Sequence, residues 1–323
     1  MFPSNSFRRS YVSLLCLGLA LLVAETRASF EDYGIPLSDA TVDVKVFNVG
    51  TASLVNTTHA FLHPVLPGRQ SITFPLFAFL VEHTTSQKRI MFDLGMRKDP
   101  MNFAPSISGL FSAGIAQVPP HKDITELLEE GGSRSIPSML LFGGNHSHFD
   151  HIGDMSKFPN TTALVVGPGT DHQLYPEFPN GALQASDFAG HNLTELNFNA
   201  THLTFGSLKA IDYFGDGSFY LLNTPGHLAG HISALARVTP TSFIMLAGDA
   251  FHHAGQLRPR PHFQHEYPCP AELLEETKSS ISTDYFWSWG THDNISTFAP
   301  ATSHYTNRRT SLTRSTSIQR RPP

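Results

Sequence analysis

Residues 143–154 read GGNHSHFDHIGD and follow a short apolar stretch that we predict to be a strand ending at Phe142. Side chains of an extended segment alternate, so two histidines at positions i and i+2 point to the same side and can hold one ion. A carboxylate and a third histidine follow where the chain turns, and they can face a second ion. The stretch therefore predicts a metal-binding loop at a strand end, and the alternative is a surface histidine cluster without metal. The four candidate ligands are His146, His148, Asp150 and His151.

Two later segments strengthen the metal interpretation. NTPGH at 223–227 ends a predicted strand in a Pro-Gly turn and presents His227, with His231 four residues further on. SFIMLAG at 242–248 ends at Asp249, whose carboxylate could bridge two cations. Each signal alone is weak, because lone histidines and Gly-Asp turns are common. Together and in this order they form a set that suits two-metal hydrolysis.

The segments HSHFDHIGD, TPGHLAGH and LAGDA, in that order and spacing, resemble the metallo-β-lactamase superfamily. FDLG at 92–95 resembles an aspartate motif at the end of an early strand in the same family, and the resemblance covers about residues 41–265. Within the superfamily the chain is most similar to the N-acyl-homoserine lactonase-like branch, and two stretches, DYFGDGSFYLLNTPGH and GDAFHHAGQLRP, resemble uncharacterised fungal members. The resemblance implies an α/β fold, a four-layer αββα sandwich, with two metal ions, usually zinc, at one edge of the paired sheets.

The family pattern implies a role for each candidate ligand. His146, His148 and His227 would hold the first metal, and Asp150, His151 and the bridging Asp249 the second, while His231 would support the ligands or be structural. Two positions depart from the pattern. Lactonases of this kind carry tyrosine three residues after the bridging aspartate, where this chain has His252, which we predict to act in catalysis as a donor or proton relay. The final histidine of the second site is best matched by His292, which arrives sooner than the family pattern expects, and His304 is a poorer candidate.

The expected reaction is hydrolysis by a hydroxide held between two cations, because such a pair lowers the pKa of water toward about 7. Asp150 would orient the hydroxide and take up its proton. The expected substrate is a small ester or lactone, since its alkoxide leaving group can bind the second metal. The alternatives are hydrolysis of a thioester or of an amide such as a β-lactam, and, in another class, an inactive secreted metal-binding protein. Phe103, Leu110 and Phe111 could form a lid over an apolar substrate chain, although ordinary loop packing is the favoured interpretation.

Composition limits the partners. The 323 residues are 40% hydrophobic and 15% charged, with a formal net charge of −5, which favours a globular domain and argues against a nucleic-acid partner. Eighteen histidines against two cysteines favour imidazole and carboxylate metal ligands over thiolates. Cys16 lies in the predicted signal segment, so Cys269 would be the single cysteine of the mature protein and an internal disulfide is not expected.

The two ends of the chain differ from the body. Residues 1–28 combine Arg8 and Arg9 with a short apolar run and small residues, which predicts a cleaved secretory signal over a retained anchor and a mature protein that does not enter the membrane. Residues 29–293 would form the hydrolase domain, and the basic, Ser/Thr-rich residues 294–323 a disordered tail. Five sequons favour a secreted glycoprotein, at Asn56, Asn160, Asn192, Asn199 and Asn294, whereas the sequon at Asn145 adjoins the histidine cluster and should be too enclosed to modify.

The remaining periodicity supports an α/β sandwich over an all-β domain. Alternating or apolar runs predict strands at 41–49, 71–84, 89–95, 138–142, 163–167, 218–222, 231–238 and 242–248, the first three forming an antiparallel sheet. DITELLEEGG at 123–132 predicts a short helix with an aspartate cap.

Overall fold

The computed structural model describes residues 29–62, 65, 67–132, 139–141 and 148–253. The predicted signal, the predicted tail, and the candidate ligands His146 and His292 lie outside these residues, as does Cys269. The chain divides into two compact units, Met1–Ile35 and Pro36–Pro323. The described part of the first unit contains one 3-10 helix, η1 (Phe30–Tyr33), which begins after Ser29.

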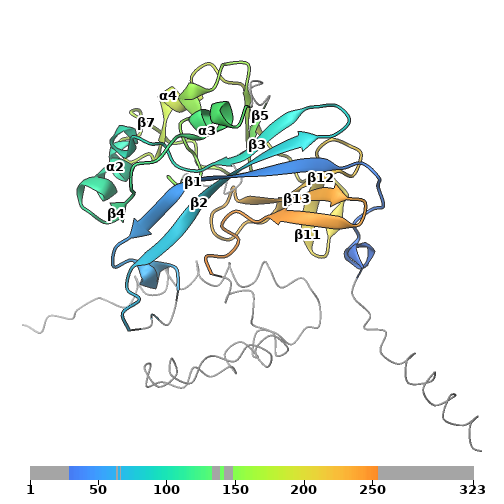
Figure 1. Ribbon diagram of the computed structural model, residues 1–323, viewed down its shortest axis with the longest axis horizontal. Coiled ribbons are helices and arrows are strands. Elements are labelled where there is room, and N and C mark those ends of the chain that lie inside the picture. Colours follow the sequence, from blue (N-terminus) through green and yellow to red (C-terminus); the bar gives the residue numbers. More distant parts are fainter. Residues whose placement is uncertain (1–28, 63–64, 66, 133–138, 142–147, 254–323) are drawn as a thin grey trace, which may run out of the picture. The chain divides into compact units, whose positions relative to one another are not determined.

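The described part of the second unit contains two main sheets, shown in Figure 1. The larger sheet has seven strands in the order β4-β1-β2-β3-β5-β6-β9. Their bounds are Ala116–Gln117, Val42–Leu54, Ile72–His83, Arg89–Leu94, Met139–Leu141, Ala163–Val166 and Leu193–Glu195. The predicted antiparallel pairing is confirmed for β1, β2 and β3, but β5, β6 and β9 continue the sheet in parallel. Helical crossovers separate these later strands, which is the connection that parallel pairing requires.

The second sheet is an antiparallel meander with the order β10-β11-β12-β13-β14. Its strands span Thr204–Phe205, Leu208–Asp212, Phe219–Asn223, Ile232–Thr239 and Ser242–Leu246. A separate pair of two-residue strands, β7 (Leu174–Tyr175) and β8 (Leu183–Gln184), lies between β6 and β9 in the sequence. Each strand predicted from periodicity is present, whereas β4, β7, β8, β9, β10 and β11 are too short or too polar to have been expected.

The two sheets pack face to face, and the side chains between them form the first hydrophobic core. Val81, Ile90 and Phe92 of the larger sheet belong to the same buried cluster as Phe219 and Ile232 of the smaller one. These residues are almost completely buried, and the members of this cluster in β3 and β13 recur at every second position, as side chains on one face of a strand do. The two sheets therefore form a sandwich, which is the central part of the predicted fold.

Helices cover the other face of the larger sheet, as Figure 1 shows. They are α2 (Pro105–Ser112), α3 (Ile124–Glu130) and α4 (Ala185–Phe188), and the 3-10 helices of this unit are η2 (Thr58–Ala60), η3 (Pro100–Asn102) and η4 (Met155–Lys157). Ile124 and Leu128 of α3 and Met155 of η4 join the second core with Leu80 and Leu94. The described residues thus provide three of the four expected layers. Helix α2 was not predicted, since Gly109 and its serines are poor helix formers.

In the described part of the chain, no helix combines the length and the apolar composition that a membrane crossing needs.

Candidate metal centre

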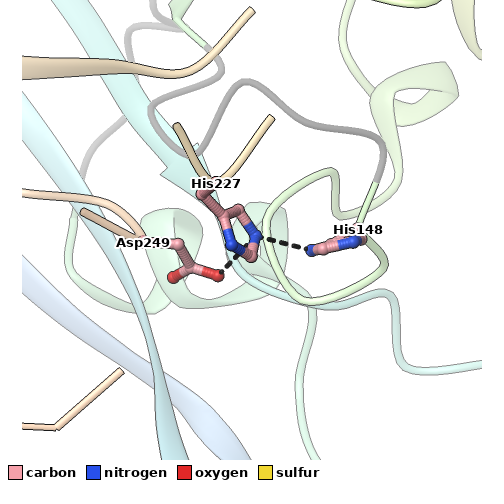
Figure 2. Close-up of side chains that lie close together, drawn as sticks. All are labelled: His148, His227 and Asp249. Carbon is pink, nitrogen blue, oxygen red and sulfur yellow. Dashed lines mark hydrogen bonds and ion pairs between the residues drawn. The ribbon is translucent and has the colours of Figure 1, made fainter. Parts of the chain in front are cut away.

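Three loops bring the candidate ligands to one edge of the sandwich. His148, Asp150 and His151 lie on the loop after β5, His227 on the turn after β12, and Asp249 on the turn after β14. Figure 2 shows His148, His227 and Asp249 pointing toward one another. Residues separated by as much as 101 positions in the sequence thus meet because the ends of strands from both sheets share one edge.

Two groups of donor atoms can each surround an ion, and Asp249 belongs to both. In the first group, His227 Nε2 lies 3.0 Å from His148 Nδ1 and 3.4 Å from Asp249 Oδ2. In the second, His151 Nε2 lies 3.4 Å from Asp150 Oδ2 and 3.1 Å from Asp249 Oδ1. The two oxygens of one carboxylate therefore face two different groups.

These separations fit divalent cations. Ligand atoms about 2.0–2.1 Å from a tetrahedral zinc ion lie about 3.3 Å from one another, which is the range observed in both groups. The donor chemistry also fits, because imidazole nitrogens and carboxylate oxygens are ordinary zinc ligands. The residues present are thus able to hold two ions that share Asp249.

The electrostatics of the two groups differ. Burial lowers the pKa of His227 to about 2 and also lowers the pKa of His148, so both rings are neutral with a lone pair to donate. Burial opposes a charge on His151 too, but the carboxylates of Asp249, Asp93 and Asp150 raise its pKa well above the ordinary value. A bound cation would interact favourably with the same carboxylates as this proton does. The second group therefore favours a positive charge, unlike the neutral rings of the first group.

Asp93, the aspartate of the FDLG segment, holds His151 from behind. Its Oδ2 lies 3.0 Å from His151 Nδ1, which leaves Nε2 facing the ligand group. The backbone of Asp93 has a φ of 61°, and Gly95 follows with a φ of 64° at a point where a Cβ would lie 2.8 Å from Val49. The tight turn at the end of β3 therefore requires glycine and aims Asp93 at the ligand loop.

The same turn holds the backbone of the ligand loop. Leu94 N–H donates to His151 O at 3.0 Å, and Gly153 N–H donates to Gly95 O at 2.9 Å. Just beyond, the Arg97 guanidinium donates to Asp154 Oδ2 at 3.2 Å, and both side chains are buried. A buried ion pair is costly to break, so this pair fixes the point where the ligand loop leaves the site.

The aromatic residue of the HSHFDH motif faces the core. Phe149 is 7% exposed, and its ring centroid lies 5.4 Å from Phe111 and 6.4 Å from Phe103. Phe103 is itself buried, and Leu110 packs against the same cluster. This arrangement agrees with ordinary packing for the 103–111 segment, and the three rings anchor the ligand loop rather than standing over it.

No family model matches the chain. It is 39% identical over 264 residues to the metallo-hydrolase mfmC of Annulohypoxylon moriforme, a match that covers 75% of this chain and 68% of that protein. It is also 41% identical over 180 residues to the gamma-lactamase MBL2 of Gibberella moniliformis, covering 54% of this chain and 74% of the relative. The chain belongs to the metallo-β-lactamase superfamily.

A third protein similar to this chain is much longer than the chain. The chain is 41% identical over 264 residues to the cytochrome P450 monooxygenase mpaDE of Penicillium roqueforti, a match that covers 78% of this chain but 30% of that protein. The chain therefore corresponds to about a third of the length of such relatives.

His252 is the residue that we predict from the sequence to stand in place of a lactonase tyrosine. Its Nε2 lies 3.6 Å from Asp249 Oδ2, and its ring lies edge-on to those of His227 and Phe61, with centroids 4.8 Å and 5.1 Å away. The side chain is 21% exposed, although its Nε2 atom is buried. The structure thus places His252 at the same edge as the candidate ligands.

Among the residues that support the candidate ligands, the sequence did not indicate Arg97 and left the role of His231 open. Arg97 has no motif signal, and its pairing with Asp154 depends on a contact between distant segments. His231, left open as supporting or structural, is fully buried, and burial lowers its pKa to about 4. Its Nε2 accepts a hydrogen bond from Asp249 N–H at 3.0 Å. The spacing of NTPGHLAGH marked this residue but could not show which partner it takes.

Proposed function

We propose that the protein is a metal-dependent hydrolase that opens the carbonyl of a small ester or lactone. One observation carries the proposal: two donor groups of metal-binding geometry share the carboxylate of Asp249. The superfamily membership of the chain and the name of its relative mfmC support the general class of metal-dependent hydrolysis. The ester or lactone substrate is the finer part of the proposal.

The ligand assignment follows the two groups. His148 and His227, with His146, would hold the first cation; Asp150, His151 and Asp249, with His292, would hold the second, and zinc is the preferred species for such donors. When bound, a pair of divalent cations supplies a hydroxide at neutral pH and polarises a carbonyl oxygen.

The residues of the chain contribute orientation and proton transfer. Asp150 is 15% exposed at its side chain and lies in the second donor group, where it can accept the proton of the attacking water. The His252 imidazole can donate a hydrogen bond to the substrate oxygen as negative charge develops there. Phe61 beside His252 and Leu228, which is 37% exposed next to His227, offer apolar contact for a substrate chain.

A γ-lactam is the second candidate substrate. The 41% identical relative MBL2 is named a gamma-lactamase, which favours an amide carbonyl in a five-membered ring. The same set of side chains can act on either carbonyl, but an amide nitrogen needs a proton to leave, whereas an alkoxide can leave unprotonated. We predict that His252 supplies such a proton, so hydrolysis of a lactam would depend on this residue more strongly than hydrolysis of a lactone.

The test is an assay of the purified full-length protein with its native metal against an aliphatic γ-lactone, a thioester, a γ-lactam and a chromogenic β-lactam, together with metal analysis. We expect about two equivalents of metal and fastest turnover of the lactone. His227→Ala should lose both, whereas Asp216→Asn, a carboxylate outside the ligand groups, should keep both. One equivalent or none, with no turnover, would instead support an inactive metal-binding protein. Turnover of the γ-lactam alone would transfer the proposal to the second candidate.

We also propose that the protein enters the secretory pathway and is glycosylated. Asn192 and its sequon partner Thr194 are both exposed, as is Asn199. Expression in a eukaryotic secretory host should yield cleavage near residue 28 and a mass that falls on treatment with an N-glycosidase. Recovery of an unmodified chain that still begins at Met1 would contradict this proposal.

A further inference from the structure

A closed series of hydrogen bonds links the turn that carries Asp249 to the turn that carries His227. Asp249 N–H donates to His231 Nε2 at 3.0 Å. On the other side of the ring, His231 Nδ1 lies 2.8 Å from Thr224 O and 2.9 Å from Thr224 Oγ1. His231 therefore lies between the two ligand-bearing turns and contacts each through a different nitrogen.

The chemistry of these partners fixes the state of the ring. A backbone N–H can only donate, so His231 Nε2 must carry a lone pair. A carbonyl oxygen can only accept, so Nδ1 carries the hydrogen and donates it to Thr224 O. The ring is neutral, with one tautomer, and both nitrogens are used.

A second arm returns to the same turn. Thr224 Oγ1 lies 3.0 Å from Ser233 Oγ, and Ser233 Oγ–H donates to Ala247 O at 2.9 Å. His231 and Ser233 have no exposed surface. Both ends of the Ala247–Asp249 turn are thus held by buried polar groups, which water does not replace when a partner is lost.

We propose that His231 is a positioning residue, which sets the direction of the Asp249 carboxylate through the backbone N–H of Asp249. The inference rests on the proposed metal site, because its consequence is that one carboxylate can serve both donor groups. Ligand side chains held from behind in this way keep their geometry, and loss of such support lowers metal affinity by about 10–100-fold.

The competing explanation is that His231 only closes the 224–231 turn through Thr224. The two explanations use different ring atoms and can be separated by substitution. The side-chain oxygen of glutamine reaches the position of Nε2 and can accept from Asp249 N–H, whereas the amide nitrogen of asparagine reaches the position of Nδ1 and can donate to Thr224 O. Leucine fills much of the same volume and does neither.

The experiment compares His231→Gln, His231→Asn and His231→Leu in the full-length protein, with His191→Gln as a control at a histidine whose Nδ1 contacts Thr162 O. Thermal unfolding first shows that each variant folds. Hydrogen exchange of the Asp249 amide is then measured in chelator-treated protein, and Zn²⁺ affinity by competition with a chromogenic chelator. We expect the wild type, His231→Gln and the control to protect this amide, and His231→Asn and His231→Leu to lose the protection and about 10–100-fold in Zn²⁺ affinity.

Equal behaviour of the glutamine and asparagine variants, or wild-type protection in the leucine variant, would overturn the inference. A leucine variant that does not fold leaves the comparison of glutamine with asparagine to decide. If the wild type binds no Zn²⁺, the proposed function fails, and amide protection still reports by itself whether His231 holds Asp249.

Discussion

The two ends of the same sandwich use histidine in opposite ways. At the end away from the candidate metal centre, His83 is 5% exposed, its Nε2 lies 2.7 Å from Asp216 Oδ2, and its Nδ1 lies 2.7 Å from Ser86 Oγ. The ring also stacks on Phe214 with centroids 4.4 Å apart. At the metal edge, in contrast, the Nε2 of His227 faces another imidazole nitrogen at 3.0 Å, and two carboxylates stand beside His151.

The difference shows what a functional cluster looks like in physical terms. The ring of His83 has the Asp216 carboxylate as an acceptor at Nε2, and the hydroxyl and backbone N–H of Ser86 at Nδ1, so both nitrogens have partners. The metal edge brings together lone pairs and negative charges that repel one another unless a proton or a cation lies among them. Burial of several such groups in one place costs stability, and a bound cation offsets that cost.

Metal removal should give the largest contrast between the two ends. With free Zn²⁺ about 1,000-fold above its Kd, the folded wild type should gain about 4 kcal/mol of unfolding free energy over chelator-treated protein. His227→Ala should lose this metal-dependent gain, whereas His83→Gln should lower stability yet keep the gain. Thermal unfolding with and without chelator measures both, and an equal loss in the two variants would remove the distinction between the ends.

Breaking the Arg97–Asp154 pair should have the next largest effect, because it supports the ligand loop and both side chains are buried. We expect Arg97→Met to lower the unfolding free energy by about 3–5 kcal/mol, since the buried Asp154 then keeps only the longer ion pair with Lys157, at 3.9 Å. Lys122→Met, which breaks an exposed pair with Glu130, should cost less than about 1 kcal/mol. Similar losses in the two variants, measured by urea unfolding, would show that the buried pair is not a special support.

Asp187 is a buried carboxyl that belongs to neither donor group. Burial raises the pKa of Asp187 to about 6, so the folded state binds a proton more tightly than the unfolded state. The wild type should therefore lose stability as the pH rises from about 4 to about 6. Asp187→Asn stays neutral, so it should match the wild type near pH 4 and exceed it above pH 6 by about 1–3 kcal/mol.

The matched variant Asp99→Asn should behave in the opposite way. Burial opposes the charge of Asp99, but hydrogen bonds from Arg97 and Asn102 lower its pKa below the ordinary value. Its contribution is therefore present at neutral pH and lost in acid, and the variant should be less stable than the wild type near pH 7. The melting temperatures of both variants and the wild type, measured near pH 4 and at pH 7.5, test these two expectations. An Asp187→Asn variant that is less stable than the wild type at pH 7.5 would contradict the raised pKa of Asp187.

The smallest effect is expected at the end of the sandwich that contains His83 and Asp216. Asp216→Asn replaces a carboxylate that is partly exposed, so we expect a loss of about 1 kcal/mol in unfolding free energy. Metal content and turnover should not change, because this residue lies in neither donor group. A drop in metal content in this variant would mean that the two ends are coupled through the sheets.

The strands of the sandwich were predicted because each contains either an alternation of apolar and polar residues, as in the run from Val42 to Val46, or a continuous apolar run. The sequence also predicted the three candidate ligand loops, since three short segments carry histidine and aspartate at strand ends, and the described candidates on these loops lie close together. It did not predict that β5 and β6 pair in parallel, because strand order depends on crossovers and not on local pattern.

The parts of the site that escaped prediction are tertiary. The pairing of Arg97 with Asp154 joins segments 57 residues apart, and the hydrogen bond from Asp249 to His231 depends on the register of β13 with β14. Neither residue pair has a spacing that would single it out. Helix α2 was missed because its packing against Phe149, and not its own composition, stabilises it.

The position of Asp249 along the chain bears on the order of events during synthesis. A growing polypeptide that has emerged only as far as β13 carries His148, Asp150, His151 and His227 but lacks the carboxylate that completes both donor groups. Capture of the proposed cation pair would therefore wait until β14 has joined the smaller sheet. Binding of the metal ions would then indicate that the smaller sheet has been assembled through β14, its last described strand.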